Sequence, residues 1–166
     1  MRIKTAIVAL AVGALSLGAA ACGGDDDDNG SASTPAAQTI ETSGTGGASV
    51  SFVDPMEGAT TGDTVTAKVQ LEGFQIDAAD VGGANKPGAG HLHFSLDDGK
   101  YDTPKYSGPN GKLAVQLGVD GMYSPATEPT ITYSGLPPGE HTLEVELVNN
   151  DHSETGTSAT TSFTVQ

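Results

Sequence analysis

The residues best suited to chemistry in this chain are histidines, two of which form a His-x-His pair. His91 and His93 are separated by a single residue. On a β-strand, such residues point to the same face and lie about 6.5–7 Å apart. Two imidazole nitrogens can then converge on one metal ion at about 2.0–2.1 Å each. Because imidazole is a ligand for copper, zinc, iron and nickel, the pair indicates a transition-metal site. Ligand type favours copper over zinc.

The other two histidines are expected to point in different directions. His152 lies in a polar loop over 149–153, and a loop side chain can be aimed at the face of a neighbouring strand. His141 shares the parity of the apolar residues in a predicted strand over 141–148, so we expect it to point toward the core. It is therefore the weakest of the metal-ligand candidates. For each histidine the alternative is a structural hydrogen-bonding or surface role. The predicted metal ligands are His91, His93 and His152.

Other chemistry is less well supported by the sequence. Met56 and Met122 can each offer a soft sulfur to Cu(I), but each stands alone. The segment 97–99, Asp-Asp-Gly, is better explained as a hairpin turn than as metal carboxylates. The chain has no Gly-x-Ser-x-Gly motif, no P-loop and no dinucleotide-binding motif. We therefore predict a non-enzymatic protein, with copper or zinc as the candidate cofactors.

Alternating apolar and polar residues predict that strands position these histidines. Helical periodicity is almost absent, whereas turn signals rich in Gly, Pro, Asn and Asp recur between the alternating segments. This pattern favours one all-β domain over 48–166, an antiparallel immunoglobulin-like β-sandwich of about seven strands. The irregular connection over 71–90 is long enough to carry function. The predicted strands cover 48–53, 64–71, 91–96, 112–117, 131–133, 141–148 and 159–165.

Composition excludes several function classes. Seven Lys and Arg residues face 21 Asp and Glu residues, which gives a formal net charge of −14. Because binding to nucleic acid depends on basic residues that displace counterions, we expect no nucleic-acid partner. A single cysteine excludes an intrachain disulfide and a cysteine-based zinc site. No protein partner can be inferred from the sequence.

The N-terminus has the pattern of a bacterial lipoprotein signal. Residues 1–21 combine a positive start, a short apolar stretch and a run of small residues, and Cys22 follows directly. In such signals the cysteine is lipidated and becomes the mature N-terminus. Residues 22–47 then form a flexible, acidic tether rich in Gly, Ser and Thr. We predict a lipid anchor on the outer face of a bacterial cell membrane. Ala19 stands where leucine is usual, so ordinary secretion remains the alternative.

Three sequence segments form a recognisable set: Pro-x-x-Gly-Ala at 55–59, Gly-His-x-His at 90–93, and Leu-x-Pro-Gly-x-His-Thr-Leu at 136–143 followed by Asp-His at 151–152. With these segments the chain resembles domain-of-unknown-function family 4399 and its relatives, which are small secreted bacterial domains. The likeness extends over about 50–165. No activity follows from this resemblance, which implies only a fold type and directs attention to the four histidines. The arrangement is also similar, in architecture alone, to periplasmic copper carriers.

These observations lead to three functional hypotheses. The first is an extracytoplasmic, lipid-anchored binding domain with a histidine-based copper or zinc site. The second is a metal-free adhesion or envelope-assembly module in which the histidines only support strands. The third is an enzyme resembling a copper-dependent dismutase, which ranks last because the ligand set is small and no bridging carboxylate is evident. The distances among the histidine side chains discriminate best between the first two.

Overall fold

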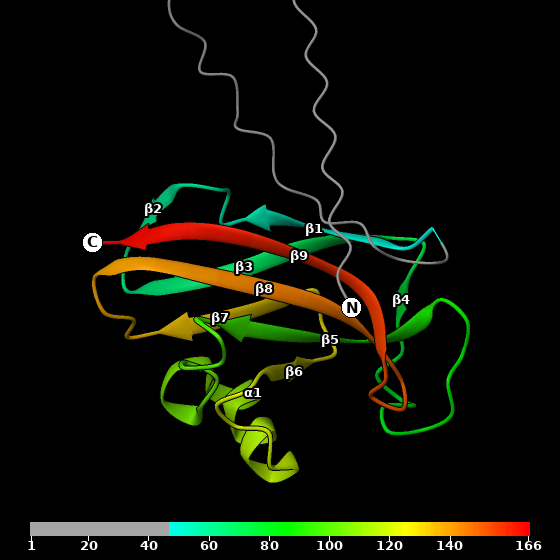
Figure 1. Cartoon of the computed structure of the whole chain (residues 1–166). Helices are drawn as coiled ribbons and strands as arrows, with labels where there is room; N and C mark the ends of the chain where they lie inside the picture. Colours follow the sequence, from blue (N-terminus) through cyan, green and yellow to red (C-terminus); the bar gives the residue numbers. More distant parts are fainter. Residues whose placement is uncertain (1–46) are drawn as a thin grey trace, which may run out of the picture. The chain divides into compact units, whose positions relative to one another are not determined.

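The computed structural model describes residues 47–166, which include the whole of the predicted domain. The predicted signal segment, Cys22 and nearly all of the predicted tether lie outside the described residues. The described part contains nine strands and one helix (Figure 1). In chain order they are β1 (Ser49–Asp54), β2 (Ala59–Thr61), β3 (Thr64–Glu72), β4 (Gln75–Ile76), β5 (Ala89–Leu96), α1 (Pro104–Leu117), β6 (Ser124–Ala126), β7 (Thr130–Ser134), β8 (Gly139–Asn149) and β9 (Glu154–Val165).

The strands form two sheets that face each other across one core. The smaller sheet has the order β1-β3-β7, and the larger has the order β2-β9-β8-β5-β4, with β6 also paired to β5. Figure 1 shows the β1-β3-β7 layer lying behind β9, β8 and β5. Most pairs are antiparallel, whereas β2 with β9 and β4 with β5 are short parallel pairs at the sheet edges. The predicted all-β sandwich is confirmed, with these parallel edge pairs as an added feature.

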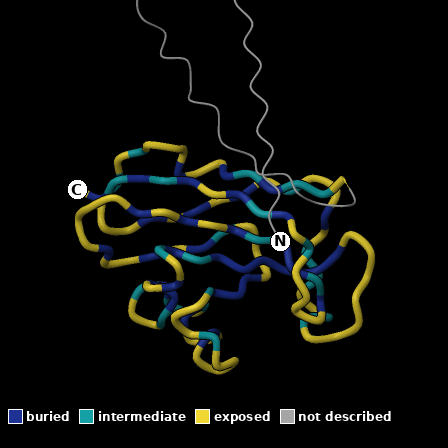
Figure 2. The backbone as a smooth tube through the Cα atoms, in the orientation of Figure 1, coloured by how far each residue is buried: buried dark blue, intermediate teal, exposed yellow. Residues whose placement is uncertain are grey.

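Strict alternation along β3 and β8 gives each sheet one apolar face. In β3, Val65, Ala67 and Val69 are buried while the residues between them are exposed. In β8 the buried face starts at His141 and continues through the apolar residues of the strand. Figure 2 shows this alternation of buried and exposed positions along the strands. Burial of each large aliphatic side chain contributes about 1.5–3 kcal/mol relative to exposure, so these faces hold the two layers together.

Strand β5 differs from its neighbours because both of its faces are covered. Leu92 and Phe94 point into the core and are fully buried. His91 and His93 point to the opposite face, as predicted from their parity, yet they are also buried, with 0 % and 9 % of their surface exposed. A strand buried on both faces requires other segments to lie over its outer side.

The predicted strand over 112–117 is wrong, because this segment is the second part of α1. Leu113, Val115 and Leu117 mimic strand alternation, but all three are exposed. The face that the helix buries carries small residues instead, including Gly111 and Ala114, so it produces no apolar stripe with helical period. A β-carbon on Gly111 would lie 2.2 Å from the Thr103 carbonyl carbon. Glycine therefore permits the close approach.

The ends of α1 follow ordinary helix rules. Pro104 stands at the start of the helix, where its missing N–H costs nothing, and Gly118 ends the helix in the left-handed conformation. Gly108 has φ 57° and ψ −121°, which kinks the helix just before Pro109. The run Gly-Pro-Asn-Gly at 108–111, whose composition is typical of a turn, thus lies at a kink within α1. The predicted hairpin turn over 97–99 is indeed a turn, but it connects β5 to α1 rather than two paired strands.

Candidate metal centre

Three histidines converge on the outer side of β5. Nε2 of His91 lies 3.0 Å from Nε2 of His93 and 3.2 Å from Nδ1 of His152. The ligand atoms of all three rings lie within 4.8 Å of one another. Two nitrogens bound to one ion at about 2.0–2.1 Å, with angles of about 90–110°, stand about 2.9–3.4 Å apart. The observed separations at His91 fall in that range, so the three histidines form a cluster that can hold a transition-metal ion.

His152 reaches β5 because the loop between β8 and β9 turns sharply at this residue. Its φ is 66°, in the left-handed region, and its N–H donates to the carbonyl of Asn149 at 3.0 Å. The His152 ring meets the His91 ring edge to face, with centroids 4.6 Å apart. His91 and His93 are buried whereas His152 is exposed. The centre is therefore open to solvent on the His152 side.

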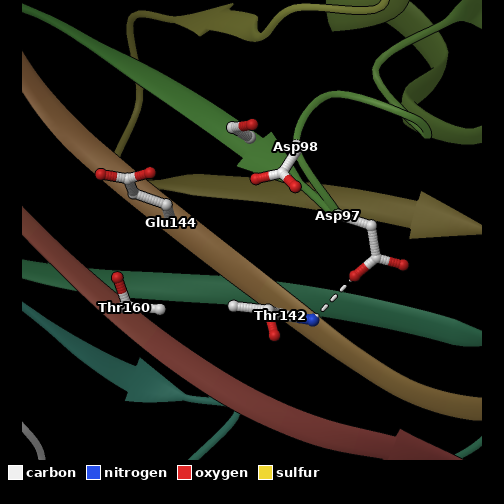
Figure 3. A pocket seen from close by; sticks show the side chains of 6 residues that line it. Asp97, Asp98, Thr142, Glu144 and Thr160 are labelled. Carbon is white, nitrogen blue, oxygen red and sulfur yellow. Dashed lines mark hydrogen bonds between the residues drawn. The ribbon is translucent and has the colours of Figure 1, made fainter.

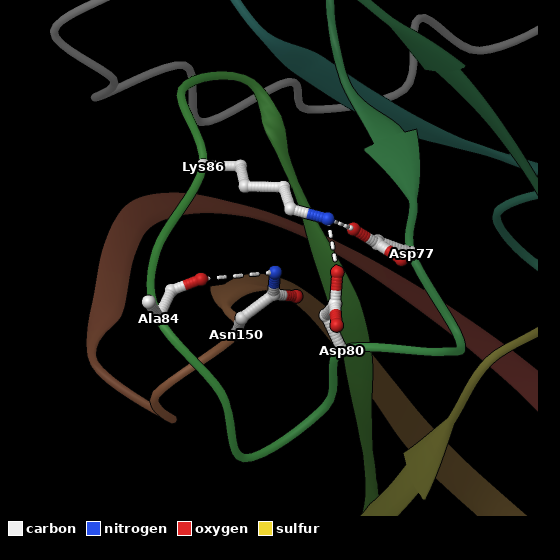
Figure 4. A network of polar contacts seen from close by, with 5 residues as sticks. All are labelled: Asp77, Asp80, Ala84, Lys86 and Asn150. Carbon is white, nitrogen blue, oxygen red and sulfur yellow. Dashed lines mark hydrogen bonds and ion pairs between the residues drawn. The ribbon is translucent and has the colours of Figure 1, made fainter.

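The long connection between β3 and β5 braces the loop that carries His152. The side-chain carbonyl of Asn85 accepts a bond from the Asp151 N–H at 2.9 Å. The Gly82 N–H donates to the carbonyl of Asn150 at 2.6 Å. Asn150 is fully buried, and its amide donates to the carbonyl of Ala84 at 3.5 Å (Figure 4). The predicted functional connection over 71–90 thus lies beside the metal centre and contacts its most exposed arm.

Within this connection, a lysine forms ion pairs with two aspartates. The Lys86 ammonium pairs with the Asp77 carboxylate at 2.8 Å and with the Asp80 carboxylate (Figure 4). The hydrogen bond from Lys86 is the main reason that the pKa of Asp77 lies below its usual value. These ion pairs are solvent-exposed, so their contribution to stability is small. Their effect is to tie together the two ends of the segment that supports Asn85.

Burial keeps the two strand histidines neutral. It lowers the pKa of His91 to about 4, with a smaller contribution from His152. It lowers the pKa of His93 to about 3, with further contributions from His91 and His152. Neutral imidazole has one free lone pair and one N–H. A metal ion binds that lone pair without competition from a proton at neutral pH.

Hydrogen bonding alone does not satisfy the three rings. Nε2 of His91 contacts two other ring nitrogens, yet a ring nitrogen has either one hydrogen or one lone pair. Only one of the two contacts can therefore be a good hydrogen bond. Nδ1 of His91 is buried and has no hydrogen-bond partner among residues 47–166. An ion bound among the rings would satisfy all three lone pairs at once, with the proton of His91 on Nδ1.

An acidic cavity of about 300 Å³ adjoins the cluster. Its lining includes His93 and His152 together with the carboxylates of Glu144, Glu146 and Glu154. Glu146 stands directly opposite His93 in the β5–β8 register and therefore shares its face. Burial raises the pKa of Glu146, and the charges of Glu154 and Glu144 add to this effect. The negative wall favours a cation in the cavity.

Tyr123 covers His93 from the segment between α1 and β6. The two rings are stacked at 12° with centroids 3.8 Å apart. This segment also places Met122 at the cavity lining, with 61 % of its surface exposed. Neither residue was among the predicted ligands. The strand register that brings Glu146 and Tyr123 to His93 depends on long-range pairing, which residue spacing does not reveal.

His141 lies outside the cluster and has a structural environment. Its Nδ1 is 2.8 Å from a carboxylate oxygen of Asp97, and its Nε2 donates to the carbonyl of Pro137 at 2.9 Å. Its ring stacks on Phe163 and meets Tyr101 edge to face. Both ring nitrogens are thus used in closing one end of the sheet. The structure separates His141 from the other three histidines, as its parity predicted.

A second acidic cavity of about 380 Å³ shares Ser95 and Glu144 with the first (Figure 3). Asp97, at its edge, accepts a bond from the Thr142 N–H at 2.8 Å, and Figure 3 shows that interaction. Asp97 is therefore occupied in fastening the turn after β5 to β8. The carboxylates of Asp98 and Glu144 complete the acidic lining.

Comparisons with known proteins add no relative, since no protein-family model, no curated protein and no solved structure matches the chain. Membership of family 4399 accordingly stays a prediction. Within residues 47–166, no helix combines the length and apolar character needed to cross a membrane.

Proposed function

We propose that this domain is a non-enzymatic, extracytoplasmic binding module that holds one transition-metal ion through His91, His93 and His152. Copper is favoured over zinc as the ion that the module binds. One observation supports the proposal, namely the convergence of three imidazole rings in which Nε2 of His91 lies at coordination spacing from a nitrogen of His93 and a nitrogen of His152. The two short contacts at Nε2 of His91 support the same proposal, since only one of them can be a good hydrogen bond, whereas a cation can bind a lone pair of each ring.

The shape of the centre fits binding and exchange of an ion. Two ligands are fixed on a buried strand, and the third lies on an exposed loop. Sites with three protein ligands leave a further coordination position open. Here the adjoining cavity with its three glutamates lies beside that position and attracts cations from solution. The module therefore combines a fixed half-site with an accessible entrance.

We further propose that the module is attached to the outer face of a bacterial cell membrane through lipid on Cys22. This part rests on the sequence pattern of residues 1–22 alone. Two or three acyl chains would give stable anchoring.

A metal-free adhesion or envelope-assembly module is the competing hypothesis. It is favoured by the 3.0 Å contact between His91 and His93, which has the length of a hydrogen bond, and by the edge-to-face packing of their rings. In that case the cluster would be a polar element of the scaffold. The two hypotheses differ in whether the domain takes up an ion with defined stoichiometry.

Calorimetric titration with Cu²⁺ and Zn²⁺ at physiological ionic strength separates them. His152→Asn is the most informative variant, because asparagine tolerates the left-handed backbone conformation and the site is exposed. We expect one-to-one binding by the wild type and a loss of at least tenfold in affinity for His152→Asn. His141→Gln is the matched control and should bind as the wild type does. Equal, salt-sensitive uptake by all three proteins would contradict the proposal.

A further inference from the structure

Met122 lines the cavity that adjoins the three histidines. It lines the same cavity as His93 and His152, and its neighbour Tyr123 stacks on the His93 ring. We propose that the Met122 thioether is a ligand to Cu(I) held by the three histidines, so that cuprous copper is the ion for which the site is selective. This inference rests on the proposed function and specifies its cargo.

The backbone of Met122 is fixed beside the centre from two sides. Its carbonyl accepts a bond from the Ser95 hydroxyl at 3.3 Å, and its N–H donates to the carbonyl of Val119 at 3.0 Å. Gly99 presses against the same carbonyl, since a β-carbon on Gly99 would lie 2.6 Å from it. Ser95 stands two residues after His93 on β5 and shares its face. The attachment of Met122 is therefore to the ligand strand itself.

The Met122 side chain, in contrast, is not held by packing. It is 61 % exposed although the residue is apolar and its cavity is acidic. Methionine has three rotatable side-chain bonds and a polarisable sulfur, so it can adjust to an ion without backbone movement. A fixed backbone with an adaptable side chain is suited to a ligand that engages only when the ion is present.

The chemistry of the donor set then distinguishes between ions. Thioether sulfur is a soft donor that selects Cu(I), whereas carboxylate and water are hard donors. The described part of the cavity offers one sulfur, that of Met122, among imidazoles and carboxylates. Zinc has an alternative fourth partner in water or a glutamate oxygen. Loss of the thioether should therefore weaken Cu(I) binding far more than Zn²⁺ binding.

Met56 supplies a matched control. It is the other methionine among the described residues, it has the same 61 % exposure, and it lies in the connection between β1 and β2, outside the cavity lining. Leucine at either position keeps size and hydrophobicity while removing sulfur. All proteins should carry Cys22→Ser, because the free thiol of an unprocessed chain would itself bind Cu(I).

The experiment compares the full chain with its Met122→Leu, Met56→Leu and His152→Asn variants. Cu(I) affinity is measured anaerobically by competition with a chromophoric chelator, Zn²⁺ affinity by the same approach, and copper–sulfur scattering by X-ray absorption. We expect Met122→Leu to lose at least tenfold in Cu(I) affinity together with the sulfur signal, and to change less than threefold in Zn²⁺ affinity. Met56→Leu should match the unchanged chain in all three measurements.

Two results would overturn the inference and leave the proposed function intact. In the first, Met122→Leu binds Cu(I) as tightly as the unchanged chain with no sulfur signal in either, while His152→Asn loses metal. In the second, Met122→Leu lowers the affinities for Cu(I) and Zn²⁺ equally, which indicates a structural effect. A His152→Asn variant that binds both metals like the unchanged chain would instead contradict the proposed function itself.

Discussion

His91 is the residue on which the candidate metal centre depends most. Its Nε2 is the atom shared by both short nitrogen contacts, and its ring is fully buried. Within residues 47–166, Nδ1 of His91 has no carbonyl or carboxylate partner of the kind that commonly orients a metal-bound imidazole. Ring contacts with His93 and His152 fix its orientation instead. The three rings therefore position one another, and removal of one should disturb the other two.

The lowered pKa values make the metal-free domain sensitive to acid. Histidine in an unfolded chain has a pKa of about 6.5, whereas burial holds the pKa of His93 at about 3. Between these values the unfolded chain binds a proton that the folded domain does not, so the free energy of unfolding falls as the pH falls. Between pH 7 and 4.5, the free energy of unfolding should fall by about 1–2 kcal/mol less in His93→Gln than in the wild type. Urea unfolding with a chelator present measures this difference. Parallel pH profiles for the two proteins would contradict this explanation.

At the scale of elements, the candidate metal centre consists of one strand covered by two loops. β5 supplies two ligands, the β8–β9 loop supplies the third, and the segment before β6 covers the pair with Tyr123. The connection between β3 and β5 reaches the site indirectly, through Asn85. Positioning of His152 should therefore depend on a residue that does not touch the ion.

Asn85→Ala tests this dependence. The substitution removes the acceptor for the Asp151 N–H and should free the loop that carries His152. Changes at such supporting residues typically cost about 10–100-fold in metal affinity. We expect about tenfold weaker binding with a melting temperature within a few degrees of the wild type. Gln116→Ala, at an exposed amide on α1, is the control. Unchanged metal affinity in Asn85→Ala would show that the loop carrying His152 keeps its position without the bond to Asn85.

The helix α1 depends on one close contact. Because a β-carbon on Gly111 would meet the backbone of Thr103 and Pro104 at 2.2–2.4 Å, Gly111→Ala should force the helix outward. Such overpacking typically costs about 1–3 kcal/mol. Gly62→Ala is the matched control, since nothing lies within 4 Å of a β-carbon there. Chemical denaturation of both variants measures the difference in their free energies of unfolding. Equal stability would show that α1 can move outward without destabilising the domain.

Sequence reasoning succeeded where one face of a strand is buried and failed where small residues or long-range pairing decide the structure. The alternation in β3 and β8 predicted both strands, since their two faces differ in polarity. The short strands β2, β4 and β6 have two or three residues each and no pattern to detect. The segment 112–117, the second part of α1, was wrongly predicted as a strand because the buried face of this helix consists of glycine, serine and alanine.

The candidate site shows the same division. Parity and loop position predicted which histidines share a face, and the structure brings His91, His93 and His152 together. The presence of Glu146 beside His93 follows from the register of β5 against β8. That register is set by the packing of both strands into the core, which no local pattern encodes.

At the scale of the whole molecule, charge and anchoring have separate effects. The net charge of −14 concentrates cations near the protein at low ionic strength, so nonspecific uptake must be screened by salt. The predicted anchor at Cys22 would hold this acidic domain at a membrane surface without electrostatic attraction to anionic lipid. Attachment should then depend on the acyl chains alone.

Lipidation is tested by metabolic labelling with a clickable fatty acid. We expect the wild-type chain to take up the label and to fractionate with membranes, and Cys22→Ser to lose both properties. Metal affinity of the domain should be the same in the two proteins, because the predicted ligands lie in residues 91–152. An unlabelled, soluble wild-type protein would favour ordinary secretion instead.

The most direct test of the metal centre is anomalous diffraction from crystals grown with Cu²⁺ or Zn²⁺. The metal would appear as a single strong peak within about 2.0–2.1 Å of Nε2 of His91, Nε2 of His93 and Nδ1 of His152. Small movements of the His152 loop would bring the third nitrogen into place. A peak on the carboxylates of Glu144, Glu146 or Glu154 with none among the imidazoles, or no ordered peak at all, would contradict the histidine-based site.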